Sequence, residues 1–156
     1  MAVYPGTKRI GYAVLDDATV LDAQIKNFPL QESMKSSLGK GKRFLARLFE
    51  KFEPNVIVIE ENSRRSEQVQ DLTNEVKRRA RCLHIPVHSY TRRDVKKTIA
   101  GNEKASKRKI AEIVVGRYPW YKREFLTLHP IKGGYQESKF EALSFAVTEF
   151  ERSKHY

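Results

Sequence analysis

Acidic side chains occur at two places where they could hold a divalent metal ion. Glu60 and Glu61 follow the apolar run of residues 56–59, and Glu137 and Glu141 stand four residues apart further along. A spacing of four puts both carboxylates on the same side of a helix. Mg²⁺ binds carboxylates and keeps other positions for water and phosphate oxygens, and two such ions can support phosphodiester hydrolysis. The simpler interpretation is that all four side chains are only solvated.

Positive charge is concentrated in one part of the chain. The 156 residues include 30 Lys and Arg against 19 Asp and Glu, which gives a net charge of +11. Residues 64–123 hold 17 of these basic residues and only 6 of the acidic ones. Such a basic block indicates a polyanionic partner, with nucleic acid favoured, although a merely solubilising surface stays open. A membrane partner is disfavoured, because no apolar run approaches the ~20 residues of a span and the basic segments lack a broad apolar face.

Aromatic residues alternate with basic ones between positions 117 and 123. Tyr118, Trp120 and Tyr121 in this setting could stack on unpaired bases. For Trp120 we expect packing against the core instead, because a single Trp in a small domain usually buries much of its ring.

The elements that must position these side chains follow from the hydrophobic pattern. Strands are predicted over residues 2–4, 10–15 and 19–26, with a turn at Pro5 and Gly6. The β-branched run at 56–59 is typical of a buried parallel strand. Further along the chain we expect a loop over 27–41, helices over 42–52, 66–83, 92–100, 105–117 and 138–151, a short strand at 85–88, and irregular structure over 118–137.

This order predicts an α/β fold, a mixed sheet flanked by helices, in one domain over residues 1–156. A three-strand meander comes first, and helices and strands then alternate. The alternative for the opening pair alone is an ordinary hairpin at the edge of a sheet. In open sheets, sites gather at strand ends. The end of the first strand, the end of the strand at 56–59 and the start of the last helix could therefore converge.

Four segments resemble a known family, in the same order along nearly the whole chain. They are the hairpin at residues 4–14, the strand at 55–60, the basic segment at 95–107 and the helix at 141–146. The chain resembles the RNase H-like superfamily, specifically its RuvC branch of Holliday-junction resolvases, and its opening hairpin is similar to that of YqgF-type proteins. The resemblance implies an RNase H-like fold, Mg²⁺ or Mn²⁺ as cofactor if the protein is active, and a dimer.

The resemblance assigns metal-binding acids to four positions, and two of them lack a carboxylate. Glu60 and Glu141 keep one, whereas the other two positions hold Tyr4 and Ser138. A phenol is neutral near pH 7 and is a poor Mg²⁺ ligand. We therefore expect a degenerate nuclease site with weak metal binding at best. The candidate substitutes are Glu61, Glu137, Asp16 and Asp17.

The favoured function is recognition of branched or structured DNA through backbone contacts, with no cofactor. The alternative is an active metal-dependent endonuclease with relocated acids, and either could act on RNA, although DNA is preferred. A sugar kinase or actin-like ATPase is disfavoured, because that fold needs two such domains. One cysteine, Cys82, cannot form an internal disulfide, which favours the cytoplasm, and we expect it to pack inside. The expected nucleic-acid contacts are Lys8, Arg9, Arg64, Arg65, Lys96, Lys97, Lys104, Lys107, Arg108 and Lys109.

Overall fold

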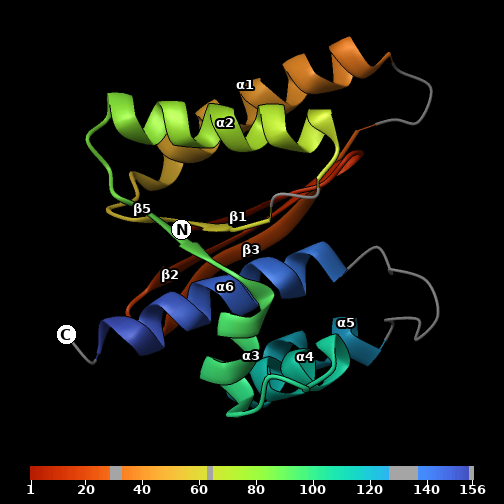
Figure 1. Ribbon diagram of the computed structural model, residues 1–156, viewed down its shortest axis with the longest axis vertical. Helices are drawn as coiled ribbons and strands as arrows, with labels where there is room; N and C mark the ends of the chain where they lie inside the picture. The colour runs from red at the N-terminus through yellow and green to blue at the C-terminus, as the bar shows by residue number, and fades with distance from the viewer. Residues whose placement is uncertain (29–32, 63–64, 127–136, 155–156) are drawn as a thin grey trace.

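Two layers of helices enclose a five-stranded sheet in the computed structural model (Figure 1). The structure describes residues 1–28, 33–62, 65–126 and 137–154. The strands are β1 (Ala2–Pro5), β2 (Arg9–Asp16), β3 (Thr19–Asn27), β4 (Ile57–Glu60) and β5 (Val87–Tyr90), in the sheet order β3-β2-β1-β4-β5. The helices are α1 (Met34–Phe52), α2 (Glu67–Cys82), α3 (Arg92–Ala100), α4 (Lys107–Arg117), the 3₁₀ turn η1 (Pro119–Tyr121), α5 (Lys122–Leu126) and α6 (Glu137–Ser153).

The strand pairing confirms the mixed sheet. β1, β2 and β3 form an antiparallel meander, while β4 pairs in parallel with both β1 and β5. β1 is the central strand, third of the five, and three of its four residues are buried. The interpretation of β1 and β2 as a hairpin at the sheet edge is therefore wrong, and β3 is the edge strand on that side.

Each face of the sheet has its own hydrophobic core. Helices α1 and α2 cover one face, and α3 to α6 cover the other (Figure 1). Helix α6 lies closest to the sheet, and residues 138–148 of it are all buried. Its first turn rests on β2 at Gly11, where a Cβ atom would lie only 2.1 Å from the backbone oxygen of Ser138. Glycine at position 11 thus allows α6 to approach the centre of the sheet.

Helix α1 begins eight residues earlier than its predicted start at position 42. Ser33 caps it by accepting a hydrogen bond from the N–H of Ser36 at 3.2 Å. Gly41, which reads as a loop residue, lies inside the helix and faces α2, where a Cβ atom would come within 2.8 Å of Leu72 Cδ2. The glycine permits close helix packing here, so composition alone misplaces the helix start.

Within and just after the basic region, the structure differs from expectation in three ways. Part of the stretch predicted to be irregular forms η1 and α5, and residues 127–136 lie outside the described residues. Trp120 is 62% exposed, so the prediction that it packs in the core is wrong, because Tyr118 and Tyr121 take the inward positions around it. Cys82 is also exposed. The apolar residues Leu72, Val76 and Ala80 form the buried face of α2, and Cys82 lies outside that face.

The ends of the remaining elements agree with the sequence pattern to within a few residues. Ser66 caps α2, and Gly101 ends α3 in the left-handed conformation that favours glycine. Across the described segments, no helix combines the length and the apolar character that a bilayer span requires.

Candidate functional site

Tyr4, Glu60 and Glu141 come together where the parallel strands β1 and β4 end, as the sequence predicts. β1 and β4 run in parallel, and Ala2 pairs with Val58. Two residues further on, Tyr4 and Glu60 therefore occupy equivalent places on adjacent strands and project toward the face covered by α6. Gly11 lies opposite Tyr4 on β2, and the first turn of α6 packs on it at Ser138. Glu141 follows on the same helix.

A single guanidinium group joins these three side chains. Arg92 Nε lies 2.9 Å from Glu60 Oε1, and Arg92 Nη1 lies 2.7 Å from Glu141 Oε1. The remaining nitrogen, Nη2, donates a hydrogen bond to the hydroxyl oxygen of Tyr4. Arginine suits this position because its planar fork can serve several oxygens at once.

The start of α3 holds Arg92 in place. The residue before it, Thr91, forms a capping box with Asp94: the N–H of Thr91 donates to Asp94 Oδ2 at 2.9 Å, and the N–H of Asp94 donates to Thr91 Oγ1 at 3.1 Å. Arg152 Nη2 on α6 pairs with Asp94 Oδ1 at 2.9 Å. Helices α3 and α6 are thereby tied together close to the site.

A second arginine closes the site from the connection between β4 and α2. Arg65 forms an ion pair with Glu60, and its Nη1 donates to the backbone oxygen of Pro5 at 2.9 Å. Its guanidinium carbon lies 4.9 Å from the centre of the Tyr4 ring, a cation–π contact. The Tyr4 ring also stacks on Phe145 at 6.2 Å. Tyr4 is thus packed on α6 and bound to two arginines.

A lysine at the start of α4 neutralises the remaining acids. Lys107 Nζ lies 2.7 Å from Glu137 Oε1 and 3.2 Å from Glu141 Oε1. Burial acts to lower the pKa of Lys107, but its bonds to these two carboxylates outweigh that effect and raise it above its usual value. Burial likewise opposes the charge of Arg92, while Glu141 raises the pKa of the guanidinium. Both groups are cations at neutral pH. Together with Arg65, they are three cations of the chain itself that face the three carboxylates of the site.

This arrangement does not fit the two-ion site that the resemblance implies. Within the described residues, no three His, Cys, Asp or Glu side chains form a group that could hold a metal ion. The oxygens of Glu60 and Glu141 already face Arg65, Arg92 and Lys107, and Tyr4 offers a neutral phenol. Ser138 is buried in the first turn of α6 and contributes no charge.

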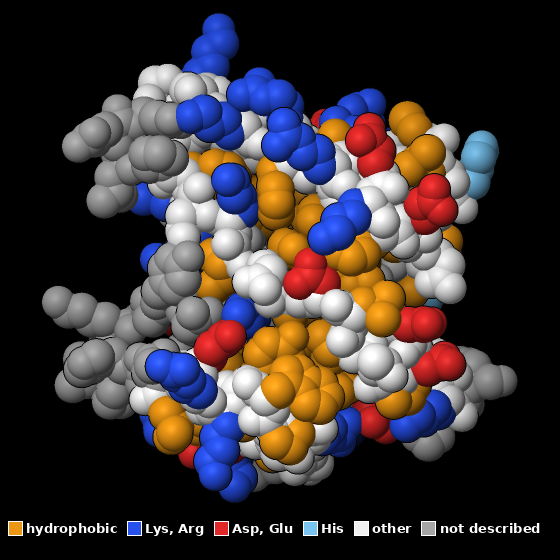
Figure 2. Space-filling model, turned by 180° about the vertical axis from the view of Figure 1, so that it is seen from behind, with side chains coloured by type: hydrophobic (Ala, Val, Ile, Leu, Met, Phe, Trp, Pro, Cys, Tyr) orange, Lys and Arg blue, Asp and Glu red, His pale blue; other side chains and the backbone are white. Residues whose placement is uncertain are grey.

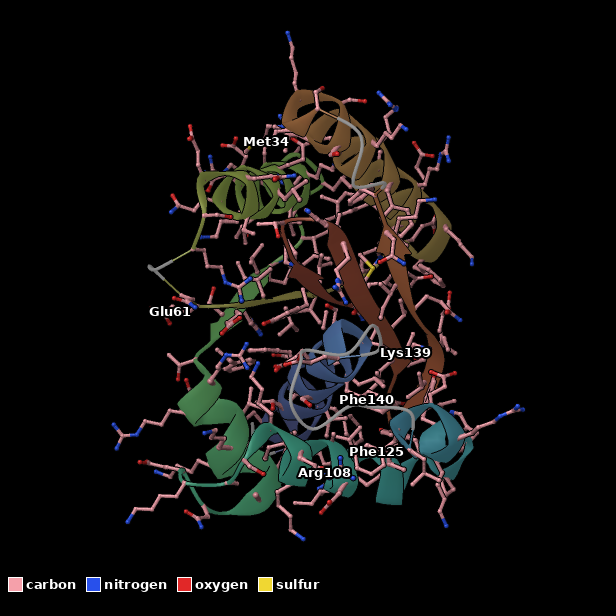
Figure 3. The ribbon with its side chains drawn as sticks, turned by 90° about the vertical axis from the view of Figure 1, so that its right-hand side faces the viewer. Met34, Glu61, Arg108, Phe125, Lys139 and Phe140 are labelled. Atoms are coloured by element: carbon pink, nitrogen blue, oxygen red, sulfur yellow. The ribbon has the colours of Figure 1, made fainter. Side chains whose placement is uncertain are left out.

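The candidate substitute acids fall into two groups. Glu137 lies close to Glu141, since both contact Lys107. Glu61 is exposed, and Figure 3 places it at the margin of the molecule, away from α6. Asp16 and Asp17 follow the end of β2 that lies beside the start of β1, because the two strands are antiparallel. They are therefore at the opposite end of the strands from Tyr4, and the expectation that they could approach the site is wrong.

The basic candidates divide between the site and the outer surface. Arg65 and Lys107 pair with carboxylates of the site, Arg65 as a largely buried side chain and Lys107 as one that is 53% exposed. We call the outer group on α3, on the α3–α4 connection and on the first turn of α4 the basic surface: it comprises Lys96, Lys97, Lys104, Arg108 and Lys109.

Charge on the basic surface is only weakly compensated. For Lys96, Lys97 and Lys104 the described residues provide no ion-pair partner. Arg108 and Lys109 share Glu112 at the longer distances of 3.6 and 3.7 Å. Of the other candidates, Lys8 is exposed at the β1–β2 turn with Arg9 half-buried beside it, and Arg64 lies outside the described residues.

Arg92 is the central residue that sequence reasoning missed. It stands within the basic region but cannot be distinguished there from Arg93. The available signal is its place directly after Thr91, in a pattern that predicts a capped helix start with Asp94 at the third position. That pattern places Arg92 at the first turn of α3, although its partners on β4 and α6 are set only by the fold.

Comparisons with known proteins bear on the family and the fold of the chain. The family model described as "Crossover junction endodeoxyribonuclease RuvC" matches residues 1–117. RuvC from Thermus thermophilus superposes with a TM-score of 0.73 at 21% identity, over 98% of this chain and 93% of that one. The same protein in complex with a Holliday junction substrate gives 0.75 at 19% identity, over 98% and 92% of the chains. The yeast mitochondrial Holliday junction resolvase Ydc2 gives 0.64 at 17% identity, over 99% and 79%.

No curated protein matches the sequence. The structural likenesses show the fold. They confirm the mixed sheet predicted from the order of elements and the RNase H-like fold that the resemblance implies.

Proposed function

Because the chain belongs to the RuvC family, we propose that it binds branched DNA through backbone contacts and that its acidic site is degenerate. The observation that carries the proposal is the pairing of the carboxylates at the expected catalytic positions with cations of the chain itself. Glu60 meets Arg65 and Arg92, and Glu141 meets Arg92 and Lys107. Guanidinium and ammonium groups thus supply the positive charge that a metal ion would otherwise bring.

Charge balance supports this view of the site. The side chain of Glu60 is only 2% exposed, so its charge needs a partner in the folded protein. An incoming dication would be repelled by the two arginines and would have to displace charge-assisted hydrogen bonds. Tyr4 adds no carboxylate to the site, so two arginines and Lys107 balance the three carboxylates that are present.

The basic surface supports the DNA-binding half of the proposal. Lys97 and Lys104 are exposed and have no ion-pair partner among the described residues, so they can neutralise phosphates, which gives affinity with little sequence readout. A protein of the same fold has been solved with a Holliday junction substrate, which favours branched DNA over RNA as the ligand. A homodimer fits the two symmetric strands of such a junction. The exposed, free thiol of Cys82 is compatible with a reducing cytoplasm.

Binding and cleavage of a synthetic four-way junction test the proposal. We expect the protein to shift the junction at concentrations that leave a duplex of the same length free, and to leave both intact in Mg²⁺ or Mn²⁺. Equal affinity for junction and duplex would overturn the binding half. Cleavage that disappears in Glu60→Gln would instead establish the active endonuclease, with Mg²⁺ or Mn²⁺ as its cofactor and Glu137 as the candidate additional acid.

The variant Tyr4→Asp tests whether cleavage is absent because a metal ligand is missing or because the arginines block the site. Restoring one carboxylate does not remove Arg92, which would pair with the new Asp. We therefore expect Tyr4→Asp to bind the junction like the native protein and to remain without cleavage activity. Tyr4→Phe serves as the matched control, because it loses the hydroxyl but adds no charge. Cleavage by Tyr4→Asp would show that the arginines do not block the site.

A further inference from the structure

The aromatic turn after α4 is the feature that the proposed function leaves unused. Trp120 in η1 is 62% exposed, the largest side chain of the described residues to be displayed in this way. Pro119 begins the turn and restricts its backbone. Figure 2 views the molecule from behind Figure 1. Hydrophobic side chains gather on the lower half of that side, with Lys and Arg side chains at their border.

The indole is exposed but firmly supported. Its ring lies 5.5 Å from that of Tyr118 and 6.1 Å from that of Tyr121, and both contacts are tilted, at 60° and 49°. Tyr118 is buried and Tyr121 packs against the same core, and burial raises the pKa of both phenols. No ring of the described residues stacks in parallel on Trp120. Tyr118 and Tyr121 therefore contact the indole without covering its face.

The elements on either side keep the turn in place. Tyr118 N–H donates to the backbone oxygen of Val114 and so continues α4 into η1. In α5, Phe125 packs edge-on against Phe140 of α6 at 6.0 Å, and the two lie side by side in Figure 3. A rigidly held aromatic side chain loses little conformational entropy when it binds, which favours its use in recognition.

The charges around the ring favour a polyanion. Lys122 and Arg123 directly follow the turn and are exposed, and neither forms an ion pair with a described residue. Arg117 precedes the turn and is paired with Glu151 at 2.6 Å. An aromatic face beside unpaired cations is the combination that binds single-stranded nucleic acid, in which the bases stack and the phosphates meet the charges.

We propose that Trp120, with Lys122 and Arg123, forms a stacking site for unpaired bases of a DNA strand bound by this protein. The inference rests on the proposed DNA binding and adds single-stranded DNA to its ligands. A fully paired duplex offers no open base face to this site, whereas an open junction, a flap or a single-stranded arm does. This stacking site is separate from the acidic site at Glu60 and Glu141, and it requires no metal ion.

Tryptophan fluorescence tests the proposal directly, because Trp120 is the only Trp among the 156 residues. We expect a single-stranded oligothymidylate to quench its emission at saturation and a duplex of the same length to leave it nearly unchanged. Binding of the oligonucleotide is followed independently by the anisotropy of a terminal dye. Saturated binding without any change in emission would overturn the proposal.

Variants supply the second measurement. Trp120→Ala is expected to weaken binding to a junction with a single-stranded arm on the order of tenfold, since one stacked base contributes roughly 1–3 kcal/mol. Its affinity for a fully paired junction should stay within about twofold of the native value. Trp120→Phe should recover much of the loss. Leu126→Ala is the matched control, because Leu126 is similarly exposed and lies nearby but has no ring.

The remaining outcomes are equally decisive. Equal affinities of Trp120→Ala and native protein for the single-stranded arm would overturn the stacking site while leaving junction binding intact. A blue shift of the emission that rises with protein concentration in the absence of DNA would show that the ring is buried between two copies of the chain, and would also overturn it. Quenching by single strands without any binding of a paired junction would refute the proposed function and retain this site.

Discussion

Arg92 and Arg93 are neighbours in the sequence, yet they belong to two differently organised regions. Arg92 faces the acidic site, is 33% exposed and connects β1, β4 and α6. Arg93 faces solvent on the same helix, is 76% exposed and pairs with Glu103, the one acidic partner that the described part of the chain gives it. In the acidic site every described carboxylate has an internal cation, whereas on the basic surface most cations have no described partner. Positive charge therefore stabilises the fold in the first region and stays available to a ligand in the second.

The largest effect is expected from Arg92→Ala. The substitution leaves Glu60 and Glu141 buried with fewer counterions, which should lower the free energy of unfolding by about 3 kcal/mol. Urea denaturation at pH 7 measures the loss. The loss should shrink in acid, because protonated carboxylates need no counterion.

Arg93→Ala is the matched control and should change stability by less than about 0.5 kcal/mol, as exposed ion pairs contribute little. Equal losses in the two variants would remove the distinction between the regions.

The next effect concerns the basic surface and DNA affinity. Replacing Lys96, Lys97 and Lys104 together by Ala should weaken junction binding by roughly ten- to a hundredfold at low salt. It should flatten the slope of log Kobs against log salt by about 0.9 for each phosphate that the variant no longer neutralises. Titrations at several salt concentrations measure both quantities.

Lys77→Ala removes an equivalent charge from α2, on the other side of the sheet, and should leave the slope unchanged. A slope that the triple variant does not alter would mean that these lysines are only solvated.

A smaller effect is expected at the capping box that holds Arg92. Hydrogen bonds from Thr91, together with Arg152, lower the pKa of Asp94 to about 2. In the unfolded chain an Asp titrates near pH ~4, so the ionised group stabilises the fold above that pH, and this contribution fades as the pH falls toward 2.

Asp94→Asn should therefore cost about 1 kcal/mol at pH 7, allowing for the partial exposure of the carboxylate, and almost nothing near pH 2. Unfolding curves at the two pH values check this. Asp71→Asn on α2 is the control. A cost that does not depend on pH would show that packing, not charge, is responsible.

The smallest effect separates Lys107 from its neighbours on the basic surface. Its charge is already engaged by Glu137 and Glu141, so Lys107→Ala should flatten the salt slope clearly less than Lys97→Ala does. Salt titrations of the two single variants make the comparison. Equal slopes would show that Lys107 leaves its carboxylates when DNA binds.

The features that the sequence pattern misplaces share a physical cause, which is packing between distant segments. The start of α1 is misplaced because a glycine within a helix, here Gly41, is unfavourable unless close packing against another helix compensates. Trp120 is misplaced because the aromatic residues on either side of it fill the core first. The expectation of a single domain over residues 1–156 stays a prediction.

The sequence by itself determined the order of helices and strands, the excess of positive charge and the absence of carboxylates at positions 4 and 138. Hydrophobic periodicity and residue type act locally, so these features can be read from neighbouring residues. Only the tertiary structure decided which cations pair with carboxylates of the site and which have no described partner. Arg65, Arg92 and Lys107 pair with residues of β4 and α6, elements that the chain pattern around each cation does not specify. The parallel register of β1 and β4 and the approach of α6 over Gly11 determine those contacts, and neither is encoded by any one segment.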